Sequence, residues 1–377
     1  MQFIKILVIF SFITLFHSYY LFGQFNVNGT LTFDGDERNY ILHMPTETIE
    51  EAEGLPLVFN LHGLGSNAVQ QEFYSGMNTT SNEENFIVCY PEGIDNSWNV
   101  GFPGGSNADD VGFISALIDE LEFLYGIDKN RVYSCGMSNG GFMSYELACK
   151  IPDQIAAIAS VTGSMTTIID CDLNTMGTPI LEIHGTADEV VPYNGSNGIS
   201  PIDDVISFWT QKNGCFPNEV TVIEINDSNQ TDGSTAEHTI YYACNENKNV
   251  ELFKITGGAH TWPGASVAIG VTNYDINANQ EIWKFFNRFS LDGSVTSVNE
   301  LQDNTLNISP NPAGQTIDVN LPESEIYTIT LHDIDGNQVA KSRDNNTIDV
   351  SLIPSGLYVI CIISNAIVIT EKVVIQH

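Results

Sequence analysis

The stretch RVYSCGMSNGGF, residues 131–142, decides the fold of this chain. It begins with a short run of β-branched and aromatic residues, which is typical of a buried strand, and residues 142–149 then continue with a helical pattern. Between strand and helix stands the pattern Gly-x-Ser-x-Gly centred on Ser138. A serine on so tight a turn needs small neighbours because its backbone is strained. The stretch therefore predicts a nucleophile elbow, with the Ser138 hydroxyl above the sheet and near the positive end of the helix.

The five-residue pattern alone also arises by chance, roughly one time in six for a chain of this length. The prediction therefore depends on the elements that surround it. An opening hairpin is expected over residues 31–45, and apolar strands then alternate with amphipathic helices. The expected strands are 55–61, 86–90, 131–137, 155–161, 179–183 and 250–255, and the expected helices are 111–125, 142–149, 202–209 and 280–289. Such alternation predicts an α/β fold with a doubly wound, mostly parallel sheet.

The chain is expected to contain four segments. Residues 1–23 have Lys5 and then an apolar run too short to span a membrane, which is typical of a signal peptide. Residues 24–290 form the α/β domain, and the polar, turn-rich residues 291–304 form a linker. Residues 305–377 consist of short strand patterns separated by turns, which predict a small all-β sandwich. No span is expected in the mature protein.

The charge balance excludes some partners. The chain of 377 residues carries 47 acids against 13 bases, which gives a net charge of -34. Nucleic acids and anionic membranes attract basic patches, so neither is an expected partner. A neutral polymer or a small ester would meet no such repulsion, although the acidity is also explained by solubility in a salty medium.

The seven cysteines fit an exported protein in which disulfide bonds can form. We expect two bonds that flank loops near the proposed site, Cys149–Cys171 and Cys215–Cys244. Cys89 and Cys135 lie on strands expected to be neighbours and are predicted to be buried thiols.

A serine nucleophile needs a base, and the base needs an acid to orient it. In a fold of this type the acid and then the histidine should follow the serine, at the ends of later strands. The strand over 179–183 is followed by Asp188, and the strand over 250–255 is followed by His260. We therefore predict Ser138 as nucleophile, Asp188 as orienting acid and His260 as general base and then acid.

Other acids and histidines of the chain fit this assignment less well. Asp109 and Asp110 precede the nucleophile, which is the wrong order for the acid. His184 precedes Asp188 and is expected to support that turn, whereas His62 belongs to a different loop. The alternatives to a catalytic role are that Asp188 caps its loop and that His260 is a histidine packed in its loop.

A tetrahedral intermediate needs backbone N–H donors. One is expected from Asn139, directly after the nucleophile, and the other from Leu64 in the loop after the early strand. Gly63 and Gly65 would let that loop approach the substrate closely. An ordinary turn at this place is compatible with the same role.

Two tryptophans, Trp98 and Trp262, fall in loops on the side of the expected site. They could flank an aromatic or sugar group of the substrate, with simple loop packing as the alternative. No histidine or cysteine cluster has the spacing of metal ligands, so neither a metal nor a cofactor is expected.

Several motifs together resemble the secreted esterase family that joins polyhydroxybutyrate depolymerases to feruloyl and acetylxylan esterases. They are HGLGS (62–66), YPEG (90–93), WN (98–99), DDVGF (109–113), RVY (131–133), GMSNGG (136–141), HGTAD (184–188) and HTWPG (260–264). The resemblance covers roughly residues 27–290 and implies an α/β-hydrolase fold. It places the family's triad on Ser138, Asp188 and His260.

The C-terminal region resembles the sorting domain of the Bacteroidota type IX secretion system. The resemblance rests on SPNP (309–312), GLY (356–358) and EKVVI (371–375). Ser309 is a departure, because an aromatic residue often stands there in that family. The resemblance implies a secreted, extracellular or cell-surface protein that is handled by the type IX machinery.

The expected function is an extracellular serine carboxylesterase that works through an acyl-enzyme on a polymer-linked ester. Release of feruloyl or acetyl groups from plant polysaccharide is the first hypothesis, and cleavage of polyhydroxyalkanoate esters is the second. A peptidase is less expected because no large gating domain precedes the catalytic one. A catalytically dead adhesion module is also less expected, since decay should have removed at least one member of the triad.

Overall fold

The computed structural model describes residues 25–45, 52–102, 105–216, 219–293, 307–320, 327–333, 338–343, 346–364 and 367–377. The predicted signal peptide, 1–23, lies outside the described residues, as does most of the predicted linker, 291–304.

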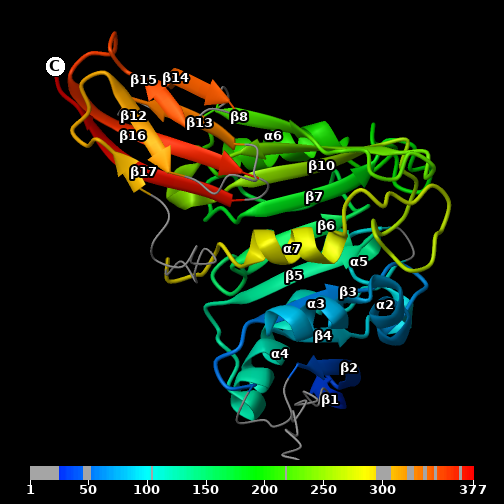
Figure 1. Cartoon of the computed structure of the whole chain (residues 1–377). Helices are drawn as coiled ribbons and strands as arrows, with labels where there is room; N and C mark the ends of the chain where they lie inside the picture. Colours follow the sequence, from blue (N-terminus) through cyan, green and yellow to red (C-terminus); the bar gives the residue numbers. More distant parts are fainter. Residues whose placement is uncertain are drawn as a thin grey trace, which may run out of the picture.

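A ten-stranded sheet forms the centre of the larger domain (Figure 1). In spatial order its strands are β1 (Phe25–Phe33), β2 (Asp36–Met44), β4 (Ile87–Pro91), β3 (Leu57–Leu61), β5 (Val132–Met137), β6 (Ala157–Val161), β7 (Ile180–Gly185), β10 (Val250–Thr256), β9 (Thr235–Tyr241) and β8 (Val220–Glu224). The six strands from β4 to β10 run parallel. Antiparallel strands extend both edges. The predicted α/β class is confirmed.

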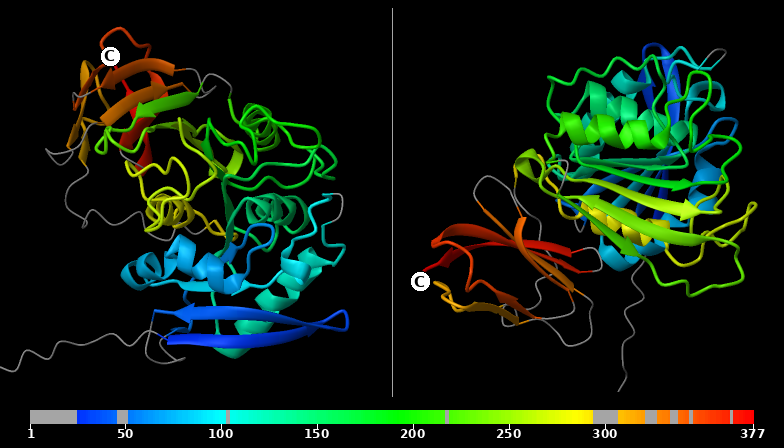
Figure 2. Two further views of the ribbon diagram at one scale, coloured as in Figure 1. Left: turned by 90° about the vertical axis from the view of Figure 1, so that its right-hand side faces the viewer. Right: turned by 90° about the horizontal axis from the view of Figure 1, so that it is seen from above.

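Helices cover both faces of this sheet (Figure 2). One hydrophobic cluster joins the sheet to α4 (Asp110–Tyr125), α5 (Asn139–Lys150) and α6 (Ile202–Lys212). The second cluster, on the other face, involves α2 (Ala68–Ser75), α3 (Met77–Glu84) and α7 (Ala278–Phe286). Two short 3-10 helices, Ile94–Asn96 and Asn245–Asn247, lie in loops.

The central strands are mostly apolar because both of their faces are covered. Side chains alternate along a strand, so β3 sends Leu57, Phe59 and Leu61 into one cluster and Val58 into the other. All four side chains are fully buried. This double burial is the physical reason why the strands could be recognised as short continuous apolar runs.

The strand order reverses between β3 and β5, since the chain passes from β3 to β4 on one side and then to β5 on the other. In open α/β sheets, ligands bind outside the carboxyl ends of the strands at such a reversal. The glycine loop after β3 and the serine turn after β5 both begin at this place.

The C-terminal region forms two small antiparallel sheets that enclose a core of their own. One contains β11 (Asn307–Ser309), β12 (Thr316–Asn320) and β15 (Thr347–Asp349), and the other contains β14 (Gln338–Arg343), β13 (Tyr327–His332), β16 (Gly356–Ser364) and β17 (Ile367–Ile375). This arrangement confirms the predicted all-β fold. His332 of β13 meets the larger domain at Glu219, where His332 Nδ1 lies 3.2 Å from Glu219 Oε2.

Both expected disulfide bonds are present. Cys149 is bonded to Cys171, and Cys215 to Cys244. Cys89 and Cys135 are free, buried thiols, as predicted.

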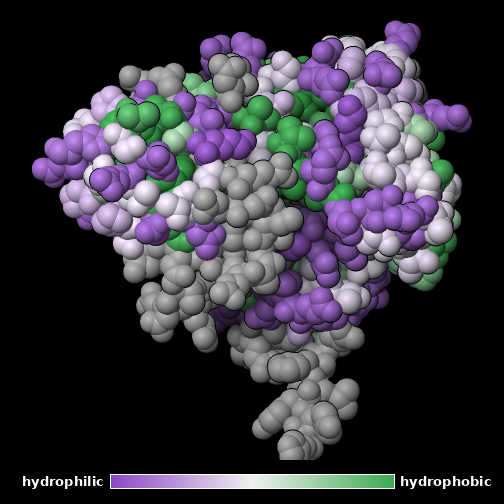
Figure 3. Space-filling view, turned by 45° about the horizontal axis from the view of Figure 1, so that its top comes forward, coloured by the Kyte–Doolittle hydropathy of each residue, from purple (hydrophilic) through white to green (hydrophobic). Residues whose placement is uncertain are grey.

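On the surface drawn in Figure 3, hydrophilic side chains are spread between smaller hydrophobic groups. Such a surface agrees with the large excess of acids over bases. None of the helices within the described ranges has the length and hydrophobicity needed to cross a bilayer.

Candidate active site

Ser138 occupies the turn between β5 and α5 with a strained backbone. Its φ of 55° and ψ of -120° lie outside the regions that non-glycine residues favour. The strain is held by two hydrogen bonds: the Ser138 N–H donates to Val161 O at 2.9 Å, and the Ser138 carbonyl accepts from the Phe142 N–H at 3.0 Å. The side chain is partly exposed at the N-terminal end of α5. This is the geometry of a nucleophile elbow.

The glycines around Ser138 are required because the turn packs against the end of β3. A Cβ on Gly140 would lie 2.1 Å from the carbonyl oxygen of Leu61, and a Cβ on Gly136 would lie 2.5 Å from the carbonyl carbon of Gly140. Both distances are too short for any side chain. The Gly-x-Ser-x-Gly pattern therefore reflects close backbone packing at the crossing of β3, β5 and α5.

Asp188 and His260 form a hydrogen-bonded pair beyond the ends of β7 and β10. His260 Nδ1 lies 2.7 Å from Asp188 Oδ2. The other carboxylate oxygen accepts the N–H groups of Val190 and Val191, each at 2.8 Å. The Asp188 side chain is fully buried, whereas 18% of the His260 side chain is exposed. An imidazole fixed at Nδ1 leaves Nε2 as the nitrogen that can exchange a proton with a neighbour.

The charge state of Asp188 follows from these contacts. Burial alone would raise the pKa of this carboxyl, but the hydrogen bond and the charge of His260, together with the Val191 N–H, outweigh burial and lower the pKa. Asp188 is thus an ionised acceptor that holds a proton on His260 Nδ1.

A second buried pair supports Asp188. His184 Nδ1 lies 2.9 Å from Glu182 Oε1, and His184 Nε2 lies 2.8 Å from Val191 O and 3.6 Å from Asp188 Oδ2. The Tyr145 hydroxyl donates to the other Glu182 oxygen at 2.8 Å. Burial would lower the pKa of His184, but the carboxylates of Glu182 and Asp188 raise it overall. His184 thus supports the turn of Asp188, in agreement with the sequence-based expectation. Glu182 and Tyr145 were not predicted.

The rival acids are engaged elsewhere. Asp110 is buried and accepts from Arg38 Nη2 at 2.6 Å and from the Asn99 N–H at 2.7 Å. Asp109 accepts the Gly112 N–H at 2.8 Å and so caps the start of α4. These contacts give both residues a structural role.

The glycine loop after β3 lies against the serine turn. A Cβ on Gly63 would be 3.5 Å from the Cβ of Ser138, so the two backbones are close neighbours. Asn139 begins α5, and the first N–H groups of a helix have no acceptor within the helix. Within the described part of the chain, the N–H groups of Leu64 and Asn139 have no hydrogen-bond partner. Both donors therefore remain available at the sheet edge near Ser138.

His62 fixes the glycine loop through hydrogen bonds of both ring nitrogens. Its Nε2 accepts the Gly93 N–H at 2.9 Å, so Nδ1 carries the proton and donates to Gly63 O at 2.8 Å. Burial lowers the pKa of His62, which keeps this ring neutral. His62 thus holds the backbone next to Leu64 and takes part in packing.

The His260 loop is tied to the same region. The Trp262 N–H donates to the Tyr74 hydroxyl of α2 at 3.3 Å, and α2 directly follows the glycine loop. Thr162 and Ala259 line the same narrow crevice, which is too small for a water molecule, so the His260 loop borders the loop after β6. The segments that carry Ser138, Leu64, Asp188 and His260 therefore share the carboxyl edge of the sheet.

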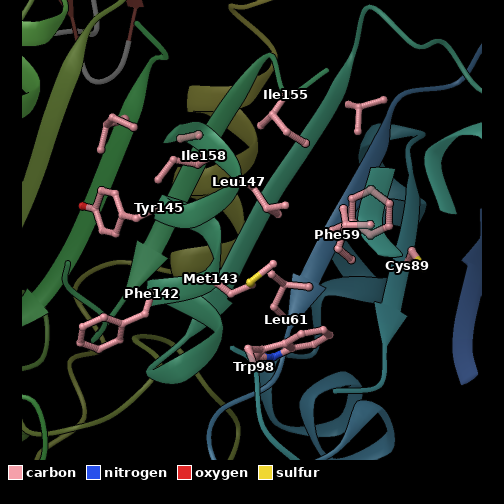
Figure 4. Packing of buried hydrophobic residues seen from close by; sticks show 14 of the residues in the cluster. Phe59, Leu61, Cys89, Trp98, Phe142, Met143, Tyr145, Leu147, Ile155 and Ile158 are labelled. Carbon is pink, nitrogen blue, oxygen red and sulfur yellow. The ribbon is translucent and has the colours of Figure 1, made fainter. Parts of the chain in front are cut away.

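The two loop tryptophans are buried, and their burial supports the packing alternative. Trp98 is 1% exposed, donates from its indole to His62 O at 2.9 Å and points into the core beside Leu61 (Figure 4). Trp262 has no exposed surface and donates from its indole to Asn279 Oδ1 at 3.0 Å. Neither ring presents a face to a substrate in this structure, because the rings fill the space beneath the loops.

Trp98 has a different part in the site. Its backbone N–H donates to Asn139 Oδ1 at 2.7 Å. The Asn139 side chain thus connects the loop after β4 to the residue that follows the nucleophile. The sequence pointed only to the backbone of Asn139, and nothing in its spacing could have shown this side-chain contact.

No group of three or more potential metal-ligating side chains occurs among the described residues. The polar groups at the sheet edge are the Ser138 hydroxyl, the imidazole of His260, the buried carboxylate of Asp188 and the backbone N–H groups of Leu64 and Asn139.

Comparison with known families gives two matches. Residues 106–207 match the phospholipase/carboxylesterase family, and residues 307–376 match the secretion system C-terminal sorting domain.

Several relatives match this chain. NocK of Nocardia uniformis subsp. tsuyamanensis, described as an esterase, is 30% identical over 249 residues, which are 62% of this chain and 72% of NocK. A protein of Aspergillus clavatus described as feruloyl esterase C is 29% identical over 69% of this chain and 86% of its own length. The bifunctional acetylxylan esterase/xylanase XynS20E of Neocallimastix patriciarum is 25% identical over 70% of this chain, but the match spans only 35% of that larger protein.

Proposed function

Because the chain belongs to the α/β-hydrolase esterase family that contains these relatives, we propose that it is a serine carboxylesterase that releases feruloyl or acetyl groups from plant polysaccharide. The protein is a carboxylic ester hydrolase, and its sorting domain makes it a secreted, extracellular or cell-surface protein. We assign catalysis to residues 24–290 and sorting by the type IX machinery to residues 305–377.

One observation carries the catalytic proposal. The imidazole of His260 is hydrogen-bonded to buried Asp188 at the sheet edge where Ser138 stands in a strained turn. Ser138 attacks the ester carbonyl while His260 accepts its proton, and Asp188 stabilises the imidazolium that forms. His260 then protonates the departing alcohol, which leaves an acyl group on Ser138. Water, activated by the same imidazole, releases the acid and restores the serine.

The negative charge that develops on the carbonyl oxygen needs fixed donors. The N–H groups of Leu64 and Asn139 supply them from the glycine loop and the start of α5. A preorganised donor of this kind contributes roughly 3–4 kcal/mol to barrier lowering. His62 and the Asn139 side chain help because they fix the backbone on both sides of the site.

The substrate class is supported by the relatives described as feruloyl and acetylxylan esterases. A neutral polysaccharide also avoids repulsion from a chain of net charge -34. The second hypothesis, a polyhydroxyalkanoate depolymerase, uses the same catalytic groups and is separated from the first by assay.

The test is a panel of methyl ferulate, acetylated xylan and polyhydroxybutyrate film, assayed with the wild type and the Ser138→Ala variant. We expect hydrolysis of the first two substrates, and a drop in turnover on the order of 10⁴ or more in the variant. Ser115→Ala, on α4, is the matched control and should keep wild-type rates. A serine-reactive phosphonate should modify Ser138, as read by peptide mass spectrometry. Near-normal hydrolysis by Ser138→Ala would overturn the mechanism, and activity confined to the film would overturn the substrate class.

A further inference from the structure

A hollow of about 450 Å³ lies between α4, α5 and two loops, away from the catalytic residues. We call it the α4–α5 hollow. Its walls include residues 99–101 and 107–111, part of α5, and residues 166 and 168–170. The volume falls in the range of small-molecule sites.

Three polar groups on its wall have no partner within the described residues. The Thr166 hydroxyl is unpaired although only 4% of the residue is exposed. The carboxylate of Glu146 forms neither an ion pair nor a hydrogen bond with any described residue, and the amide of exposed Asn107 is also free. Buried polar groups in proteins are normally hydrogen-bonded, so an unpaired hydroxyl on a residue that lines the hollow leaves a hydrogen bond that a side-chain rotation toward a ligand would supply.

The remaining wall is mixed. Lys150 and Asp170 form an ion pair at 2.9 Å across one side, and Val100, Val111 and Ile168 supply apolar surface. A wall that offers hydrogen-bond donors and acceptors beside apolar side chains suits a sugar. The hydroxyl groups at the edge of a sugar ring need hydrogen-bond partners, and its C–H faces pack against apolar surface. No group of three possible metal ligands is found among the described residues, which separates this wall from a cation site.

The hollow and Ser138 both lie along helix α5. Phe142, Glu146 and Lys150 are spaced four residues apart on α5, so they follow one side of the helix, and Ser138 is the residue directly before its first turn. Glu146 is eight residues beyond Ser138, or roughly 12 Å along the helix. Between them, the rings of Phe142 and Phe102 are in contact, with centroids 4.9 Å apart. A chain of sugar units bound in the hollow could therefore present an ester at Ser138.

We propose that the α4–α5 hollow binds a neutral, hydroxyl-rich oligosaccharide, the part of the substrate that carries the ester. Glu146 and Asn107 accept and donate hydrogen bonds to sugar hydroxyls, and Thr166 provides a buried contact. The proposal rests on the proposed function for its biological meaning, but the binding itself needs no ester.

The test uses the full chain with Ser138→Ala, titrated with unesterified xylotetraose by isothermal calorimetry. We expect saturable binding that weakens at least tenfold when Glu146→Gln or Asn107→Ala is added. Glu122→Gln and Asn130→Ala change exposed side chains outside the hollow and are the matched controls. Asn107 is exposed in a loop, so Asn107→Ala should fold normally. Its binding result therefore decides the test even if Glu146→Gln lowers the stability of the protein.

A kinetic readout accompanies the titration in the active enzyme. The ratio of kcat/KM for a feruloylated oligosaccharide to kcat/KM for methyl ferulate should fall about tenfold in either hollow variant. Absence of xylotetraose binding, equal binding by the hollow and control variants, or saturation by spermine instead of the sugar would overturn the proposal. Failure of the esterase proposal would show differently, as no ester hydrolysis despite sugar binding.

Discussion

His260 Nδ1 lies 2.7 Å from Asp188 Oδ2, and the same carboxylate oxygen lies 3.6 Å from Nε2 of buried His184. Asp188 is therefore held between a partly exposed imidazole and a fully buried one. The exposed ring faces the sheet edge where chemistry is proposed, and the buried ring anchors the acid to the core through Glu182.

Replacing Asp188 by Asn should lower kcat on the order of 10³–10⁴ and leave KM nearly unchanged. An amide at this place can present its NH₂ group to Nδ1 and stabilise the wrong tautomer of His260. Steady-state kinetics on a small ester measure the effect. Asp153→Asn, on an exposed turn, is the matched control. Wild-type turnover by Asp188→Asn would remove this carboxylate from the mechanism.

The buried pair of Glu182 and His184 should contribute strongly to stability. Glu182→Gln or His184→Asn removes one partner and leaves the other uncompensated, which typically costs about 3–5 kcal/mol of unfolding free energy. Tyr145→Phe removes only one hydrogen bond to Glu182 and should cost about 1 kcal/mol. Denaturant unfolding of the three variants measures how much unfolding free energy each one loses. Equal losses in all three would contradict the proposed ionic pairing.

Two glycines close to Ser138, Gly140 and Gly63, should respond differently to alanine. In Gly140→Ala the new methyl would meet Leu61 O at 2.1 Å, so the backbone must shift, at a cost of about 1–3 kcal/mol or more. In Gly63→Ala the methyl would find ordinary contacts at 3.5 Å, and stability should change little. Thermal unfolding compares the two variants. A tolerant Gly140→Ala would mean that the crossing of β3 and α5 is looser than described.

His62 should make the protein less stable in acid. The unfolded histidine takes up a proton near its ordinary pKa of about 6.5, whereas burial lowers the pKa of folded His62. Below about 6.5 the unfolded state therefore binds the extra proton first, and the unfolding free energy falls until the pH reaches the lower folded pKa.

The measurement is denaturant unfolding at a series of pH values. His62→Gln can still accept the Gly93 N–H but does not titrate, so part of the acid-induced decline should disappear. If the decline is the same in the wild type and in His62→Gln, the neutral, buried state of His62 is not its cause.

Much of the larger domain could be predicted because its central strands are buried on both faces. Mostly apolar runs mark β3, β4, β6 and β7 in the sequence, and the motif around Ser138 marks β5 and α5. Helix α3 was not predicted, since its sequence MNTTSNEE contains one large apolar residue and no helical stripe. The hairpin of β8 and β9 was also missed, because these edge strands mix polar with apolar residues and are partly exposed.

Chain order and local motifs were enough to predict some features of the proposed site. The disulfide partners and the positions of Asp188 and His260 beyond consecutive parallel strands were anticipated. The burial of Trp98 and Trp262 was not decided by the sequence, since an indole suits a binding surface and a loop core equally well. The Glu182 contact and the Asn139 side-chain contact depend on three-dimensional packing alone.

The buried thiols of Cys89 and Cys135 bear on the resistance of the two disulfide bonds to exchange. Burial raises the pKa of both Cys89 and Cys135 well above the usual range for a thiol. Thiol–disulfide exchange needs an accessible thiolate, which neither residue can supply once the central sheet has formed. The folded enzyme thereby keeps these two thiols away from its two disulfide bonds, and exchange through Cys89 or Cys135 is confined to the time before the central sheet has formed.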